Sequence, residues 1–272
     1  MYRFPKNAPL DAAVMETCDT QFDRALLQIP HYRNHPEMLP FVGRGYADRP
    51  ARVMLVGESH YVSNKARKNA APRDVVADFG ALDWYESPLC FADPDNVFCT
   101  DFGNYTTRYI LNRFVTEPGF GGGGLLMFSN PLRAYYCTDE ASEKPPKQLI
   151  HNFAFLNYYQ RPAFAFGRTI NGVQGEWSAE LAARDNAVAA ETLDAVIRTI
   201  EPDAVIVLSS KAYRTYALTN GAFCRNGREG VPSLHVLPHP TSAWWNRRTK
   251  RGTCGRESFR AILTAAWGNP NN

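Results

Sequence analysis

The chain has 272 residues, of which 44% are apolar and 21% are charged, a balance typical of a globular protein with a large core. Its net charge of +3 at pH 7 is too small to indicate nucleic-acid binding from overall charge alone. No apolar segment is long enough to span a bilayer, and no apolar signal segment follows Met1. These features predict a soluble protein in the cytoplasm.

Six cysteines are scattered along the chain: Cys18, Cys90, Cys99, Cys137, Cys224 and Cys254. No two of them form the CxxC pair that a zinc ribbon or a dithiol redox motif uses. We therefore expect reduced thiols, as is usual in the cytoplasm, with no metal and no cofactor.

The first half of the chain contains one clear strand signal. Residues 1–50 are punctuated by prolines and predict an irregular segment with one short helix over 20–28. Residues 52–56 (RVMLV) form a short apolar run closed by Gly57, which is typical of a strand buried on both faces. The polar, proline-broken stretch over 63–100 predicts a surface segment.

A helix and a connector complete this half. Apolar residues at helical spacing predict a helix over 104–114. A phosphate-binding loop follows a strand and ends in GK[ST], but the four glycines at 121–124 have neither feature. They therefore favour a flexible connector.

Strands and helices alternate through the second half of the chain. Apolar runs predict strands over 153–158, 204–208 and 234–237, and periodic patterns predict helices over 178–200, 210–218 and 258–267. Because the strand runs are apolar on both faces, they indicate a parallel sheet covered by helices. We expect a single domain over 1–272 with a three-layer α/β/α fold around a central four-stranded parallel sheet.

Polar residues follow every predicted strand. The segment GESHY begins at Gly57, Asn157 lies at the end of the second strand, SSK (209–211) follows the third, and PHPTS (238–242) follows the fourth. The carboxyl ends of parallel strands meet at one edge of a sheet, where open α/β folds bind their ligands. The sequence therefore predicts one site at this edge.

In their order, these segments resemble the motifs of the uracil-DNA glycosylase superfamily. GESHY stands where that superfamily has G-[QEMI]-x-P-[YG], FLN (155–157) is similar to its LLN signature, and HPTS (239–242) is similar to its H-P-S loop. The stretch PDAVIVLSSKAY resembles its P-x-x-[IV]-[IV]-[AV]-L-G unit, with Ser209 where Gly is usual. The resemblance covers about residues 50–268 and implies a uracil-DNA glycosylase-like fold.

Three departures from that superfamily affect the expected activity. Ser59 stands where the best-studied branch has a water-positioning Asp. A second branch has GEAPG and shares Glu58, but this chain has His60 in place of the Pro. That branch holds an iron–sulfur cluster through four cysteines, whose spacing the scattered cysteines here do not match.

The resemblance implies catalytic roles for four residues. Breaking an N-glycosidic bond leaves a cationic sugar and an anionic base, and the nucleotide must first be flipped out of the duplex. Glu58 would orient or activate water and favour the cationic sugar, and Ser59 or His60 would help to hold that water. His239, between two prolines, would donate to the oxygen on which the leaving anion develops.

The same resemblance implies a pocket for the flipped base. Asn157 carries both a donor and an acceptor, which suits the Watson–Crick edge of a pyrimidine. Tyr61 would wall the pocket and reject a 5-methyl group. Phe153 or Phe155 would stack on the base. His60, which precedes Tyr61 in GESHY, would also belong to this base-binding pocket.

The loop LPHPTSAWWNRRTKR (237–251) combines an imidazole, two tryptophans and four cations. By resemblance, Trp244 or Trp245 would be the apolar wedge that enters the minor groove behind the flipped nucleotide. The cations would contact phosphates and hold the register: Arg247, Arg248, Lys250 and Arg251. The expected partner is DNA, either single-stranded or a duplex with a flipped base.

Structural alternatives exist for each of these features. His239 and Asn157 could be turn residues, the tryptophans could pack in the core, and the cations could be a solvated face. The first functional hypothesis is a DNA glycosylase acting on uracil or another deaminated base. The second is a catalytically inactive superfamily member that binds nucleic acid or another partner. A hydrolase using His60 or His239 with a nucleophilic residue is disfavoured because no GxSxG motif is present.

Overall fold

Five strands form one sheet in the order β1-β3-β2-β4-β5 within the residues that the structure describes. The computed structural model describes residues 17–61, 85, 106–120, 125–137, 144–163, 179–224, 231–250 and 252–270. The strands are β1 (Phe41–Val42), β2 (Val53–Tyr61), β3 (Phe153–Ala163), β4 (Ala204–Val207) and β5 (Ser233–Val236). Four strands lie where the sequence predicts them: β2, β3, β4 and β5. Neighbouring members of this set pair in parallel.

The sheet differs from the expected four parallel strands at one edge. Strand β1 pairs antiparallel with β3, with Phe41 opposite Phe155 and Val42 opposite Ala154. The fold is therefore a mixed α/β fold with a five-stranded, mostly parallel sheet. A two-residue strand has too short a pattern to be distinguished from the irregular segment predicted there.

The two central strands are longer than predicted. Strand β2 runs through the whole GESHY segment, and β3 continues to Ala163. The two pair from Val53 opposite Phe153 to Tyr61 opposite Ala163, with an irregularity between Ser59 and Tyr61. The prediction that Gly57 closes the first strand is wrong, because pairing with β3 extends the strand beyond the apolar run.

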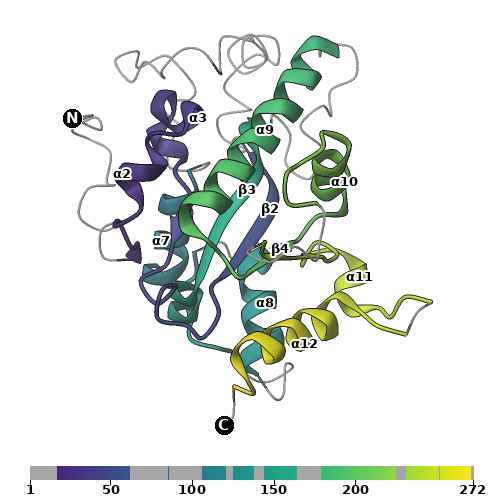
Figure 1. Ribbon diagram of the computed structural model, residues 1–272. Coiled ribbons are helices and arrows are strands. Elements are labelled where there is room, and N and C mark those ends of the chain that lie inside the picture. The colour runs from purple at the N-terminus through teal and green to yellow at the C-terminus, as the bar shows by residue number, and fades with distance from the viewer. Residues whose placement is uncertain are drawn as a thin grey trace.

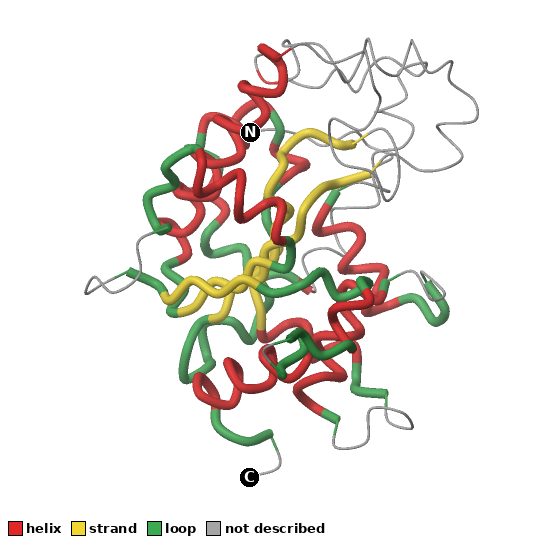
Figure 2. The backbone as a smooth tube through the Cα atoms, turned by 90° about the vertical axis from the view of Figure 1, so that its right-hand side faces the viewer, coloured by secondary structure: helices red, strands yellow, loops and turns green. Residues whose placement is uncertain are grey.

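Helices lie on both sides of the strands (Figures 1 and 2). The long helices are α7 (Thr107–Thr116), α8 (Leu126–Tyr136), α9 (Ala179–Ile200), α10 (Ser210–Leu218) and α12 (Gly255–Trp267). Short helical segments are α2 (Asp23–Leu26), α3 (Pro30–Asn34), η1 (Pro36–Met38), η3 (Lys147–Asn152) and α11 (Ala243–Asn246). Helix α9 packs on β3, and α10 packs on β2, β4 and α9.

Aromatic contacts from β3 identify which helices share a face. Phe153 packs on Trp267 of α12, with the ring centroids 4.8 Å apart, and Phe155 meets Phe128 of α8 at 5.0 Å. Tyr158 instead meets Tyr216 of α10 at 6.1 Å. Because side chains alternate along a strand, α8 and α12 cover one face of β3 and α10 lies on the other.

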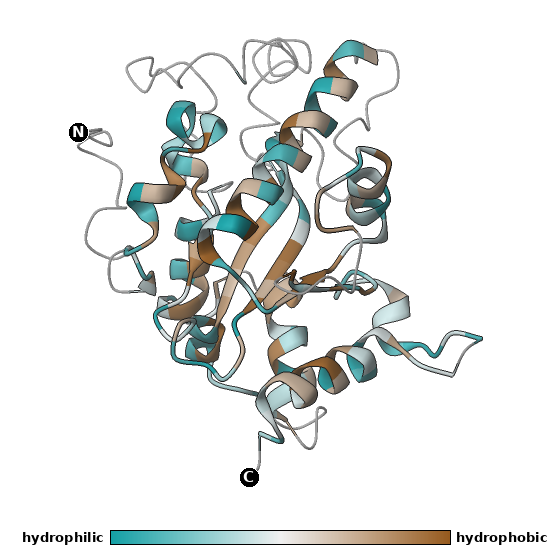
Figure 3. Cartoon of the chain, viewed as in Figure 1, coloured by the Kyte–Doolittle hydropathy of each residue, from teal (hydrophilic) through white to brown (hydrophobic). Residues whose placement is uncertain are grey.

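The core follows the apolar runs of the sequence. Val53, Met54, Leu55 and Val56 are fully buried, as a strand covered on both faces requires. Apolar colour gathers along the strands and on the helix sides that face them (Figure 3). The predicted apolar side of α9 is buried along its whole length. None of the helices in the described ranges is long and apolar enough to cross a membrane.

Several element boundaries differ from the predictions. The N-terminal helix spans only Asp23–Leu26, and α3, η1 and β1 occupy part of the segment predicted to be irregular. Helix α8 was not predicted because Pro131 lies inside it. Helix α12 begins at Gly255 because Glu257 accepts from the backbone N–H of Cys254 at 3.3 Å, which caps the helix earlier. The expectations for 63–100, apart from Tyr85, and for 121–124 fall outside the described residues.

Candidate functional site

The point where the chain reverses direction across the sheet lies between β2 and β4. From β2 the chain proceeds to β3 on one side, and from β4 it proceeds to β5 on the other. Open α/β sheets bind ligands in the crevice beyond the carboxyl ends of the strands at such a reversal. Glu58, late in β2, and Ser209, directly after β4, are the polar residues at this point.

The first turn of α10 holds the Glu58 carboxylate. The Ser209 hydroxyl donates to Glu58 Oε2 at 2.7 Å, and Lys211 Nζ lies 4.0 Å from Oε1. Ser209 Oγ also accepts from the backbone N–H of Ala212 at 3.1 Å, which makes Ser209 the N-cap of the helix. Both carboxylate oxygens therefore have a partner from α10, while the Glu58 side chain keeps 19% of its surface exposed.

Lys211 lies between a carboxylate and an aromatic ring. Its Nζ is 5.5 Å from the ring centroid of Tyr159, in addition to its contact with Glu58. Burial lowers the pKa of the Lys211 ammonium below its ordinary value, and the charge of Glu58 offsets part of this effect.

Asn157 lies directly over the bare backbone of Gly57. A Cβ at Gly57 would overlap Asn157 Oδ1 and would lie 3.0 Å from Phe155 Cζ and 3.1 Å from Met127 Cε. The amide nitrogen of Asn157 donates to His60 Nδ1 at 3.3 Å. The motif glycine therefore leaves the space that the amide occupies, and the pairing of β2 with β3 places Asn157 opposite Gly57, the residue before Glu58.

His60 is buried, as are Ser59 and Phe155. His60 supports the Asn157 amide, and its ring is close enough to His31 of α3 to influence the titration of that residue. Phe155 packs edge-to-face on Phe128 at the Gly57–Asn157 contact. Phe153 lies in the core against α12, so Phe155 is the remaining stacking candidate of the two.

Tyr61 ends β2 and is partly exposed. Burial, together with the nearby negative charge of Glu58, raises the pKa of the Tyr61 hydroxyl to about 12. Tyr61 therefore remains protonated at neutral pH and lies within the electrostatic reach of Glu58, as a residue in the wall of this site would.

His239 is held in one tautomer by its own loop. The backbone N–H of Thr241 donates to His239 Nδ1 at 3.2 Å, and the Thr241 hydroxyl lies 2.7 Å from the same nitrogen. Because Nδ1 accepts, the neutral ring carries its proton on Nε2. Asn130 of α8 donates to the carbonyl of Pro240 at 2.8 Å and fixes the loop to the helix.

His239 and Glu58 influence each other electrostatically. Burial lowers the pKa of the His239 imidazole, and the charge of Glu58 acts in the opposite direction. This coupling requires the two residues to be near one another, although they come from β2 and from the loop after β5. This coupling brings together two of the predicted strand-end residues, Glu58 and His239, whereas the contacts of Asn157 are with Gly57 and His60.

The two tryptophans of the loop have different environments. Trp245 is 1% exposed and packs on Phe259 of α12, with ring centroids 5.8 Å apart. Gly255 accommodates it closely, since a Cβ there would lie 2.9 Å from Trp245 Cε3. Trp244 is 56% exposed. Trp245 is thus a core residue rather than a wedge, and Trp244 remains as the wedge candidate.

Three of the loop's cations, Arg247, Arg248 and Lys250, are exposed, and the segment after α11 projects from the molecule (Figure 1). The backbone N–H of Thr249 donates to the carbonyl of Thr253 at 2.9 Å, and Gly252 adopts a φ of +85° that favours glycine. Arg248 forms a 2.8 Å ion pair with Glu257, while Arg247 and Lys250 are exposed. Arg251 lies outside the described residues.

Sequence reasoning placed Ser209 and Lys211 at this edge but assigned them no role. The signal for Ser209 was available, because it replaces a glycine of the motif it resembles and an N-cap serine offers a hydroxyl. Asn130 had no signal, because α8 itself was not predicted.

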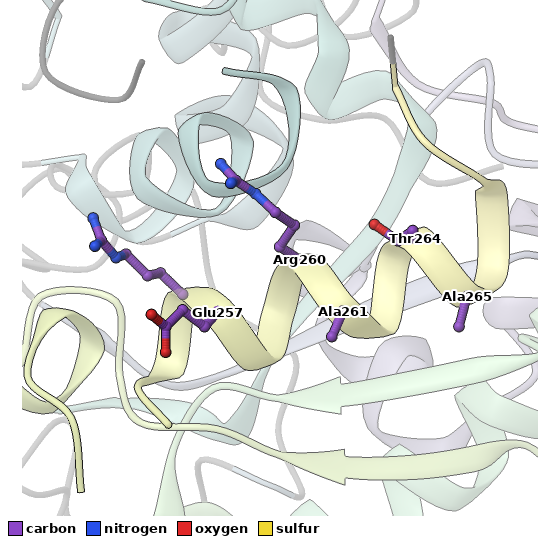
Figure 4. Close-up of a pocket in the computed structure, with 6 residues that line it drawn as sticks. Glu257, Arg260, Ala261, Thr264 and Ala265 are labelled. Carbon is purple, nitrogen blue, oxygen red and sulfur yellow. The ribbon is translucent and has the colours of Figure 1, made fainter. Parts of the chain in front are cut away.

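Two surface grooves lie elsewhere. One, of about 620 Å³, runs along α12 (Figure 4) and is lined by Arg256, Glu257, Arg260, Ala261, Thr264 and Ala265. Arg260 donates to the carbonyls of Ala134 and Cys137, and Glu257 pairs with Arg248, so these side chains already tie α12 to its neighbours. The other, of about 550 Å³, includes Arg52, Glu201 and Asp203 at the opposite end of the strands. Neither groove includes Glu58, Asn157 or His239.

No group of three or more His, Cys, Asp or Glu side chains in the described ranges is arranged to hold a metal ion. No protein-family model matches the sequence, and a search of curated proteins finds no match. The functional interpretation therefore depends on the motifs and on the geometry of this edge.

Proposed function

We propose that this chain is a uracil-DNA glycosylase-like protein with a three-layer α/β/α fold, which excises uracil or another deaminated base from DNA in the cytoplasm. The observation that carries the proposal is the proximity of Glu58 and His239 at the strand reversal between β2 and β4, with Asn157 on β3 opposite Gly57. They come from three segments distant in the sequence and supply a carboxylate, an amide and an imidazole.

Glu58 is the residue that acts on water and on the sugar. Its carboxylate accepts from Ser209 and faces Lys211, so it is held at the edge of the sheet with part of its surface open. A fixed negative charge favours the cationic sugar that forms as the bond breaks, and a carboxylate can orient or deprotonate the attacking water. Ser59, which replaces the Asp of the best-studied branch, has no carboxylate for this step.

His239 is the donor for the leaving base. Its lowered pKa favours the neutral ring, and the acceptor role of Nδ1 leaves the N–H on Nε2. A preorganised donor of this kind stabilises an oxyanion as it develops, and losing one costs on the order of a hundredfold in rate. The contact between Asn130 and Pro240 keeps the loop in place.

The base pocket is formed by Asn157, Tyr61 and Phe155. The Asn157 amide is oriented by His60 and offers a carbonyl and an N–H₂ to the base edge. Phe155 lies next to Gly57 and Asn157, where a flipped base would stack. Tyr61 walls the site and, as in the superfamily that the motif resembles, would exclude a 5-methyl group.

DNA contacts come from the projecting loop after β5. Trp244 is the exposed wedge, and Arg247, Arg248, Lys250 and Arg251 are the phosphate contacts. The wedge and His239 belong to one loop, so that base flipping and leaving-group stabilisation occur together.

Single-turnover release of uracil from single-stranded and mismatched oligonucleotides tests the proposal. His239→Ala should abolish release, Glu58→Gln should reduce it strongly, and Ser59→Ala should be mild. His235→Ala is the matched control, because His235 is also a partly buried histidine with a lowered pKa but lies within β5 and contacts Ser233. If His235→Ala is as damaging as His239→Ala, the assigned role of His239 is wrong.

A second candidate function is supported by Ser59. A superfamily member without the water-positioning Asp could bind nucleic acid or another partner without catalysis. In that case the parent protein binds DNA but releases no base, and Ser59→Asp switches release on. If both proteins are inactive on every deaminated base, the glycosylase proposal fails and the non-catalytic function replaces it.

A further inference from the structure

Lys211 has an unusual position for a lysine. It is the second residue of α10, after the N-cap Ser209, where the helix dipole disfavours a positive charge. Burial disfavours the ammonium as well, whereas Glu58 and the ring of Tyr159 favour it, and the balance lowers its pKa. A lysine in this environment supplies more of its neutral, nucleophilic amine than a solvated lysine does.

The surroundings of Lys211 also provide a proton acceptor. Glu58 Oε1 lies 4.0 Å from Lys211 Nζ, and the Tyr159 ring covers the ammonium at 5.5 Å. Attack by an amine on a carbonyl carbon requires a proton to leave nitrogen and a proton to reach oxygen. Glu58 is close enough to accept the first of these protons and to return it.

The proposed base excision would produce a matching carbonyl. Removing the base leaves a deoxyribose whose ring-opened form carries an aldehyde at C1′, at the same edge as Glu58. We propose that Lys211 captures this aldehyde as an imine, so that the site holds the abasic product covalently and reversibly. This inference rests on the proposed function.

The step balances without any redox partner. The neutral Lys211 amine adds its electron pair to C1′, and the electrons of the carbonyl π bond move to the oxygen. Glu58 accepts one proton from the nitrogen and returns it to this oxygen, which gives the carbinolamine. Glu58 then takes the second proton from the nitrogen and passes it to the hydroxyl, which leaves as water, so that a C=N bond remains. Addition of water reverses the sequence and returns the aldehyde and the amine.

Lys147 provides a matched control. It is also partly buried and lies over an aromatic ring, with Nζ 5.1 Å from the Phe114 centroid. Its Nζ donates to the backbone carbonyl of Glu117 at 3.2 Å rather than facing a carboxylate of the site. Lys147 therefore shares the packing of Lys211 without its position at the sheet edge.

Borohydride trapping on an oligonucleotide with a preformed abasic site tests the proposal. Hydride reduces the imine to a stable secondary amine, and peptide mapping by mass spectrometry identifies the modified residue. The parent and Lys147→Arg should give an adduct at Lys211. Lys211→Arg, which keeps the charge, should lose it while retaining the parent's thermal unfolding midpoint and DNA affinity.

The outcomes separate this inference from the proposed function. A preformed abasic site needs no base excision, so an adduct at Lys211 without uracil release overturns only the glycosylase proposal. Uracil release without an adduct overturns only the imine. An adduct that persists in Lys211→Arg, that maps to another residue, or that never forms with the parent also rejects the role of Lys211. If Lys211→Arg does not fold, Lys211→Met replaces it under the same criteria.

Discussion

The Ser209 hydroxyl donates a 2.7 Å hydrogen bond to the Glu58 carboxylate and thereby joins the start of α10, just after β4, to β2. The same hydroxyl accepts the N–H of Ala212 and caps α10. A glycine at this position, as in the motif that this segment resembles, could make neither side-chain contact. The hydrogen bond that holds Glu58 therefore depends on the serine side chain.

Substitution of Ser209 should separate these two contacts. Ser209→Ala removes the cap and should lower the free energy of unfolding by about 1 kcal/mol. Ser209→Gly should lower it by only a few tenths of a kcal/mol, because glycine is a tolerated N-cap. Both variants lose the donor to Glu58 and should show the same reduced uracil release. Urea unfolding and single-turnover kinetics measure the two effects, and Ser210→Ala, at the exposed next position, is the control. Unchanged release in both variants would show that Glu58 does not depend on Ser209.

Gly57 should tolerate no side chain while Asn157 is present. Gly57→Ala places a Cβ against Asn157 Oδ1 and should destabilise the protein by about 1–3 kcal/mol, as overpacking does. The double variant Gly57→Ala/Asn157→Ala should recover part of this loss, because the first clash is removed and only the Phe155 and Met127 contacts remain. A double-mutant cycle by chemical denaturation tests this; simple additivity would contradict the contact.

His31 should make the protein less stable in acid. It is buried against His35, with ring centroids 5.2 Å apart, and neither ring nitrogen has a hydrogen-bond partner among the described residues. Burial, with the charges of His35 and His60, holds its pKa well below the ordinary 6.5. A lowered histidine pKa means that the unfolded chain binds the proton first, so stability is fully present above pH 6.5 and falls as the pH decreases toward the folded-state pKa.

His31→Phe keeps the ring and removes this titration. Above pH 6.5 the variant should be at least as stable as the parent, because it no longer buries unpartnered nitrogens. Below that pH its unfolding free energy should decrease less steeply. Denaturant titrations at a series of pH values measure the slope. Parallel pH curves for both proteins would show that His31 is not the source of the acid sensitivity.

The sequence predicted the parts of this fold whose signals are local. Four strands were predicted because each contains a mostly apolar run, although β5 is only partly buried, and α9 was predicted because its period is long and regular. Strand β1 and the extension of β2 through GESHY depend on pairing with β3, which no local pattern records. Helix α8 was concealed by Pro131. At the site, the topological rule predicted that Glu58 and His239 lie near one another, but the contacts of Ser209 and Lys211 depend on where α10 begins relative to β2.

The salt dependence of DNA binding should identify the cations that touch phosphate. Arg247 and Lys250 are exposed on the projecting loop, and each phosphate that they neutralise should contribute a slope of about −0.9 in log K against log salt on duplex DNA. The double variant Arg247→Ala/Lys250→Ala should therefore flatten the slope by about two units. Fluorescence anisotropy over a salt series measures it. Arg24→Ala with Arg33→Ala, two cations on the N-terminal helices, is the charge-matched control. An equal flattening by that control would mean that only net charge matters.

The adjacent tryptophans Trp244 and Trp245 should have opposite effects when replaced by alanine. Trp245→Ala empties a core site against Phe259 and should cost about 3–5 kcal/mol of stability. Trp244→Ala removes an exposed side chain and should change stability by less than about 0.5 kcal/mol. Its loss should instead weaken DNA affinity by roughly tenfold or more, since a stacked aromatic contributes about 1–3 kcal/mol per base.

Thermal unfolding and DNA binding, measured on both variants, test the assignment. Trp244→Phe is the conservative control and should retain most of the affinity, because a phenyl ring still provides an apolar surface for insertion. If Trp244→Ala binds DNA as tightly as the parent, Trp244 is not the wedge. The presence of Trp244 and His239 on one loop would then need another explanation. If Trp244→Ala is as unstable as Trp245→Ala, the Trp244 ring is not exposed. The assignment of Trp245 to the core and of Trp244 to the DNA-facing surface then fails.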